Sequence, residues 1–89
     1  MNKSITDGTI IDVRTNNDYL QGHVENSINL PLENISKVET IISNKDKELY
    51  IYCNLGIRSK EAVNYLLKLG YTNVYDVGRT RNIKIKLVE

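Results

Sequence analysis

Cys53 is the residue in this sequence best suited to act as a nucleophile. A loop with a central glycine follows it and leads through Arg58 into a helix expected to begin at Ser59. The N–H groups at that helix start and the cation of Arg58 would stabilise a thiolate, the nucleophilic form of cysteine. Gly56 lets successive N–H groups point inward, and we expect Ser59 to cap the helix. The pattern therefore predicts a preformed thiolate that needs no separate base.

The length of this loop separates two kinds of cysteine chemistry. Cysteine-dependent phosphatases hold phosphate with five residues between the cysteine and the arginine, whereas only four, residues 54–57, separate Cys53 from Arg58. The smaller ring suits a single sulfur atom carried as a persulfide, because its anionic terminal sulfur needs the same N–H donors. A structural alternative stays open, in which Cys53 is a small buried apolar residue, Gly56 forms a turn and Arg58 is solvated.

Three other polar residues could border such a site. His23 follows a glycine, and we expect it to form structural hydrogen bonds and not to act as a base. Asp12 and Arg14 are two residues apart on a strand, so they share one face. They either line the pocket or lock its rim through ion pairs with charges such as Asp18 or Glu25, and we favour the lock.

The composition narrows the range of functions. The 89 residues predict one domain, residues 1–89, and 12 Lys and Arg against 11 Asp and Glu leave a net charge of +1, too little to hold nucleic acid or a membrane. One cysteine and one histidine exclude an internal disulfide and a Cys/His zinc site in one chain. No stretch reaches the roughly 18 apolar residues of a membrane helix, and the start lacks the apolar core of a secretory signal. We therefore expect a cytoplasmic monomer without metal or cofactor.

The elements expected to position Cys53 alternate between strands and helices. Strands are predicted at residues 9–14, 27–30, 49–53, 71–77 and 83–87, and helices at residues 15–22, 32–42 and 59–69. Because parallel strands need crossover connections, this order predicts an α/β domain with a mainly parallel sheet. Ligands bind beyond the carboxyl ends of such strands, which is where Asp12 to Arg14 and Cys53 fall.

Several motifs occur together in an order that resembles the single-domain rhodaneses, which are thiosulfate sulfurtransferases, and most of all their phage-shock protein E type. The motifs are Asp12-Val13-Arg14, Tyr19 with Gly22-His23-Val24, Asn29-Leu30-Pro31-Leu32, Tyr52-Cys53-Asn54-x-Gly56, Arg58-Ser59 and Gly70-Tyr71-Thr72-Asn73-Val74. Together they extend over most of the chain, so the signal is far more specific than an isolated Cys-x-x-Gly.

The resemblance implies a fold, a reaction and a set of site residues. The fold would be a mainly parallel sheet of about five strands, flanked by helices on both faces. Cys53 would be the catalytic sulfur carrier, and the substrate-binding cradle would be Asn54, Leu55, Gly56, Ile57, Arg58 and Ser59. The Cys53 thiolate would attack thiosulfate or another sulfane-sulfur donor, and a thiol or cyanide would accept the sulfur without a cofactor. Arg58 would then face the departing sulfonate oxygens.

Other functions remain open at this stage. A rhodanese-like module can bind a partner without catalysis, and a phosphatase, an arsenate reductase or a redox-sensing thiol are further possibilities. The intact Cys53, Gly56 and Arg58 favour the enzyme. An acidic partner would fit the basic cluster, but nucleic acid is not expected because no aromatic residues are interleaved with it. The cluster consists of Arg79, Arg81, Lys84 and Lys86.

Overall fold

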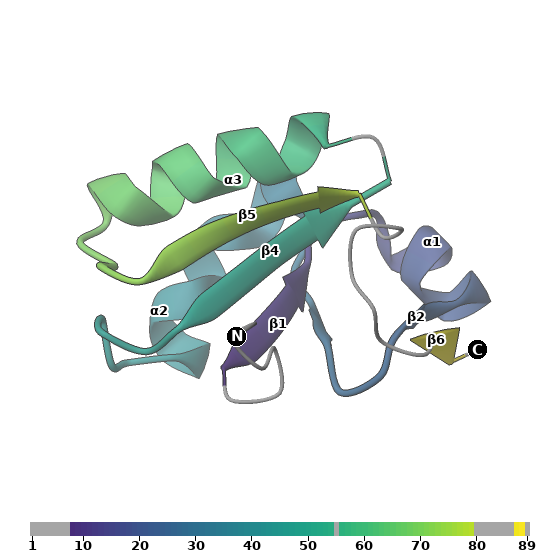
Figure 1. Ribbon diagram of the computed structural model, residues 1–89, viewed down its shortest axis with the longest axis horizontal. Coiled ribbons are helices and arrows are strands. Elements are labelled where there is room, and N and C mark those ends of the chain that lie inside the picture. Colours follow the sequence, from purple (N-terminus) through teal and green to yellow (C-terminus); the bar gives the residue numbers. More distant parts are fainter. Residues whose placement is uncertain (1–7, 55, 80–86, 89) are drawn as a thin grey trace, which may run out of the picture.

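A parallel β-sheet forms the framework of the computed structural model, which describes residues 8–54, 56–79 and 87–88. Within these residues the sheet has four strands in the order β3-β1-β4-β5, and every neighbouring pair is parallel (Figure 1). The strands are β1 (Thr9–Asp12), β3 (Ile28–Asn29), β4 (Leu49–Cys53) and β5 (Val74–Arg79). The predicted α/β class is confirmed, with four described parallel strands where about five were expected.

A second, smaller pairing lies beside this sheet. Strand β2 (His23–Val24) pairs antiparallel with β6 (Leu87–Val88). Of the strand predicted at residues 83–87, only Leu87 falls among the described residues, where it belongs to β6. The other positions of that prediction, 83–86, lie outside the described part of the chain.

The central strand β4 is buried along its whole length, and its side chains alternate between two apolar clusters. Leu49, Ile51 and Cys53 belong to one cluster, whereas Tyr50 and Tyr52 belong to the other. Because neighbouring side chains of a strand point to opposite faces, the two clusters lie on opposite sides of the sheet. At the end of β4, Cys53 therefore points to one face of the sheet and Tyr52 to the other.

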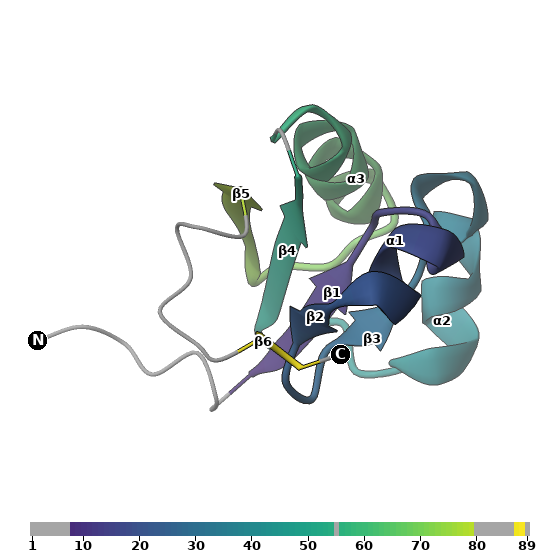
Figure 2. The ribbon, with the colours of Figure 1, turned by 90° about the vertical axis from the view of Figure 1, so that its right-hand side faces the viewer.

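Helices pack on the first of these faces. Helix α3 (Ile57–Lys68) contributes Ala62 and Leu66 to the cluster that contains Cys53. The segment formed by the 3-10 helix η2 (Leu32–Lys37) and helix α2 (Val38–Ile41) contributes Ile35 and Val38, and Figure 2 shows α2 and α3 on one side of the sheet. On the second face, Val24 of β2 packs against Ile10 and the two tyrosines of β4.

The helix predicted at residues 32–42 is divided into the η2 and α2 segments. Its core-facing positions supply the reason, because the partly buried Leu32 and the buried Ile35 and Val38 recur every three residues. That spacing matches the 3.0 residues per turn of a 3-10 helix, so a tighter helix keeps all three side chains on the sheet. The α-helical part continues only to Ile41, which is exposed.

Glycines end two helices as predicted. Helix α1 (Asn16–Gln21) is capped by the Thr15 side chain, which accepts from Asp18 N, and the chain leaves it at Gly22. After α3, Gly70 adopts a positive φ of 102°, and Tyr71 N donates back to Leu66 O in a Schellman turn. No helix in the described residues is long and apolar enough to span a membrane.

Candidate active site

The sulfur of Cys53 lies at the carboxyl end of β4 and accepts two backbone hydrogen bonds. Gly56 N donates to Cys53 Sγ across 2.9 Å, and Ser59 N donates across 3.4 Å. The residue itself is 2% exposed. In Figure 1 the arrowheads of β4 and β5 point toward the loop that leads into α3, so the sulfur lies at the edge where parallel sheets bind ligands. Two N–H dipoles directed at one sulfur stabilise negative charge on it.

Helix α3 begins earlier than the sequence suggested, and the predicted cap at Ser59 is wrong. The helix starts at Ile57, with Gly56 in the N-cap position at a φ of 85°. Ser59 is therefore in the first turn, buried, and its hydroxyl donates to Gly56 O across 3.2 Å. The physical reason is that Cys53 Sγ accepts the Ser59 N–H, the bond that an N-cap side chain normally accepts. The sulfur replaces the conventional cap.

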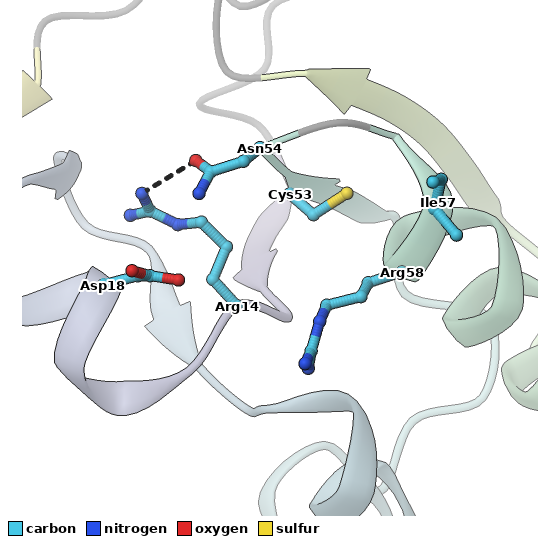
Figure 3. A pocket seen from close by; sticks show the side chains of 6 residues that line it. All are labelled: Arg14, Asp18, Cys53, Asn54, Ile57 and Arg58. Atoms are coloured by element: carbon cyan, nitrogen blue, oxygen red, sulfur yellow. Dashed lines mark hydrogen bonds between the residues drawn. The ribbon is translucent and has the colours of Figure 1, made fainter.

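A cavity of about 280 Å³ opens in front of the sulfur. Its described lining comes from the loop after β4, the start of α3, and the segment after β1 (Figure 3). The lining residues are Arg14, Asp18, Cys53, Asn54, Ile57 and Arg58. Four of the seven residues named for the nucleophile and the cradle thus meet in one cavity, while Gly56 and Ser59 contribute through their N–H groups. The remaining predicted position, Leu55, lies outside the described residues.

Arg14 forms one wall of the cavity and is held by a buried carboxylate. Its Nη2 lies 2.8 Å from Asp12 Oδ2, and its Nε lies 3.0 Å from both carboxylate oxygens. Nη2 also donates to Gly22 O across 2.6 Å, and Nη1 donates to Asn54 Oδ1 across 3.2 Å. Burial alone would lower the pKa of Arg14, but the hydrogen bonds and charge of Asp12 outweigh it and raise that pKa. The guanidinium therefore stays charged and links β1 to the loop after Cys53.

The same carboxylate is also bound from the second face of the sheet. Tyr52 donates its hydroxyl proton to Asp12 Oδ2 across 2.8 Å and accepts from Val24 N across 3.0 Å. Burial, the largest cause, raises the pKa of Tyr52 to about 12. The phenol thus remains neutral and a proton donor at ordinary pH, so the network from Tyr52 through Asp12 to Arg14 is fully hydrogen-bonded.

Arg58 projects from the first turn of α3 along the other side of the cavity. Its Nη1 lies 3.2 Å from Glu33 Oε1 on η2, and the Glu33 side chain is mostly exposed whereas that of Arg58 is partly exposed. In Figure 3 its guanidinium end is directed away from the Cys53 sulfur. Arg58 is therefore part of the cavity, as predicted, but it is ion-paired and not simply solvated.

His23 lies elsewhere and makes the structural contacts expected of it. Its Nδ1 is 2.8 Å from Tyr19 O, and its ring stacks on the Tyr19 ring with centroids 3.7 Å apart. It is not among the described residues that line the cavity. The side chains of the basic cluster at Arg79, Arg81, Lys84 and Lys86 lie outside the described residues.

The sequence reasoning missed two partners of the site. The sequence predicts Tyr52 in the strand at residues 49–53 and assigns it no role. Because Tyr52 is next to Cys53, its side chain points to the opposite face of the sheet, where its hydroxyl contacts Asp12. Glu33 carried no signal at all, because it pairs with a residue 25 positions away through a connection that only the fold defines. The sequence favours ion pairs of Asp12 and Arg14 with nearby charges such as Asp18 or Glu25, whereas in the structure Asp12 and Arg14 pair with each other.

Comparisons with known proteins give similarities over most of the chain. A model of the rhodanese-like domain family matches residues 1–78. Thiosulfate sulfurtransferase PspE of Escherichia coli is 35% identical over 80 residues, 89% of this chain and 77% of that protein. The tRNA uridine(34) hydroxylase of Photorhabdus laumondii is 37% identical over 76 residues, but the chain spans only 22% of it. A solved E. coli structure, described as a rhodanese with anions, has a TM-score of 0.87 at 34% identity, covering 91% of this chain and 96% of that one.

Proposed function

The chain belongs to the rhodanese-like domain family, and on this premise we propose that it is a sulfurtransferase that carries sulfur as a persulfide on Cys53. Membership of this family supports sulfurtransferase activity in general. The observation that carries the specific proposal is the pair of N–H groups, from Gly56 and Ser59, that point at Cys53 Sγ. A loop of this kind stabilises a thiolate before the reaction and the anionic persulfide after it.

In the first half of the proposed reaction, the Cys53 thiolate attacks the outer sulfur of thiosulfate. The bond between Sγ and that sulfur forms while the sulfur–sulfur bond of thiosulfate breaks, and the electron pair leaves with sulfite. The negative charge of the enzyme moves from Sγ to the terminal sulfur of the persulfide. Arg58, at the cavity wall, offers a cation to the sulfonate oxygens as they depart.

In the second half, an acceptor attacks the terminal sulfur and regenerates the Cys53 thiolate. Cyanide would leave as thiocyanate, and a thiolate would leave as a persulfide, so no redox cofactor or metal enters the balance. We propose a thiol as the acceptor in a cell, with thiosulfate standing for the wider class of sulfane-sulfur donors. A cytoplasmic location belongs to the same proposal, because the free Cys53 must stay reduced between turnovers.

Intact-protein mass spectrometry without reductant tests the proposal directly. After incubation with thiosulfate, the wild-type chain should gain one sulfur atom, and cyanide should remove it with release of thiocyanate. Cys53→Ser should gain nothing, and sulfite in place of thiosulfate should load neither protein. A wild-type chain that gains no sulfur from thiosulfate or from an organic persulfide would contradict the enzyme assignment and favour a binding module.

A further inference from the structure

Both cations that line the Cys53 cavity in the described residues have a carboxylate partner. Of the charged side chains that line it among the described residues, Arg14 and Arg58 are cations and Asp18 is an anion. Arg14 is paired with Asp12, and Arg58 is paired with Glu33, which lies just outside the lining. A substrate anion that binds either guanidinium must therefore compete with a carboxylate that is already paired with it.

The two pairs differ in how easily they can be opened. The Asp12 and Arg14 side chains are 0% and 9% exposed, and the pair is fixed by several hydrogen bonds. The side chains of Glu33 and Arg58 are 65% and 42% exposed, and one contact of 3.2 Å joins them. Exposed pairs of this type contribute little to stability, so a bound anion can compete for Arg58. A sulfur donor in this cavity must thus compete with Glu33 for the Arg58 guanidinium.

Glu33 also lies in a neighbouring cavity of about 270 Å³ between η2 and α3, together with Glu61. Glu61 is thus a second acidic side chain in the cavity beyond Glu33, and it adds negative charge there. When Arg58 turns toward a donor at Cys53, the Glu33 carboxylate loses its partner. The resulting penalty grows with the negative charge of the donor.

We infer that Glu33 sets the donor specificity of the proposed sulfur transfer, by discriminating against dianionic donors and favouring monoanionic ones. The favoured class comprises organic thiosulfonates and persulfides, which present one negative charge where thiosulfate presents two. This inference rests on the proposed function and adds the substrate class to it. Glu33 acts here through Arg58 and through its charge, without contact to the reacting sulfur.

Thiosulfate and methanethiosulfonate form a matched pair of probes. Each donates one sulfur to the Cys53 thiolate with cleavage of a sulfur–sulfur bond, and the electron pair leaves with sulfite or with methanesulfinate. The donors differ in that a methyl group replaces one charged oxygen. Their ratio of kcat/KM therefore reports the cost of the second charge and cancels differences in folding or in active enzyme concentration.

Glu33→Gln in the full chain tests the inference, with Glu39→Gln as the matched control. Glu39 is also an exposed glutamate in an ion pair, with Lys45 at 2.7 Å, and neither residue is among the described residues that line the Cys53 cavity. Glu33→Gln should raise the kcat/KM ratio of thiosulfate over methanethiosulfonate about two- to five-fold, mainly through the KM for thiosulfate, as expected for loss of one exposed ion pair. Glu39→Gln should leave the ratio unchanged.

A second variant shows whether the effect passes through Arg58. In an Arg58→Gln background, adding Glu33→Gln should change the ratio by less than half of its effect in the wild type, because the competing cation is gone. An unchanged or lowered ratio in Glu33→Gln, with both donors still forming persulfide, would overturn the inference and leave the proposed function standing. Failure of both donors to load the wild-type chain would overturn both together.

Discussion

The Tyr52 hydroxyl donates a 2.8 Å hydrogen bond to Asp12 Oδ2, and the two residues approach each other from neighbouring strands, β4 and β1. Asp12 in turn holds Arg14, which reaches Asn54 in the loop after Cys53. A buried network therefore connects the second face of the sheet to the cavity. The network holds Arg14 in the wall of the cavity, and none of its hydrogen bonds is made to the Cys53 sulfur.

Asp12→Asn should destabilise the protein by about 3–5 kcal/mol, because it leaves the buried Arg14 cation without its counter-ion. Urea unfolding followed by circular dichroism measures the change. Asp18→Asn is the matched control, since Asp18 lines the same cavity but is less buried, and its effect should stay within about 0.5 kcal/mol. Equal losses in the two variants would contradict the role assigned to the Asp12–Arg14 pair.

Gly56→Ala should impair sulfur loading, whereas Gly70→Ala should not. Both glycines have positive φ values, 85° and 102°, so either substitution strains the backbone at a cost of about 1–3 kcal/mol. Only Gly56 donates its N–H to Cys53 Sγ, so only this variant should lose persulfide formation, by about ten-fold or more. Mass spectrometry should be used to compare the rates of persulfide formation in the two variants, at a temperature where both are folded. Similar loading in both would show that the Gly56 contact is not used.

Because Tyr52 is buried, the free energy of unfolding should fall at alkaline pH. Its pKa of about 12 in the folded state exceeds the value of about 10 in an unfolded chain, so the folded state retains the proton more tightly. The associated stability is present below about pH 10 and is lost as the pH rises toward 12. Urea unfolding between pH 9 and 11.5 should show a steeper loss for the wild type than for Tyr52→Phe. Parallel curves would contradict the assignment.

Tyr71→Phe should lower stability without affecting sulfur transfer. The Tyr71 hydroxyl donates to Ile42 O across 2.5 Å and joins the end of α2 to the turn after α3, away from the cavity. Loss of a buried hydrogen bond of this kind costs about 1–3 kcal/mol. Tyr65→Phe, at a tyrosine that is 38% exposed, should be nearly neutral in the same unfolding assay. A changed persulfide loading rate in Tyr71→Phe would show a coupling that the contacts do not suggest.

The parts that local sequence predicts well are those whose chemistry is local. Cys53, its glycine loop and the alternation of strands and helices lie close along the chain, so spacing and residue type were enough to place them. The start of α3 was misplaced because a sulfur from the preceding strand, and not a side chain of the helix, accepts its N–H group. The Arg58–Glu33 and Arg14–Asn54 contacts join residues 25 and 40 positions apart, and only the packed fold specifies them.

Cys53 Sγ is both the proposed reacting atom and the acceptor of two backbone hydrogen bonds, so the two amide groups can report its chemical state. The Gly56 and Ser59 amide protons bond to the same atom that would gain and release sulfur, so their NMR chemical shifts should follow the chemical state of that atom without any label attached to the cysteine. Because Ser59 belongs to the first turn of α3, a change at the sulfur also reaches the backbone of that helix. Turnover would then be visible as a change in the NMR signals at the N-terminal end of α3, the longest helix in the described chain.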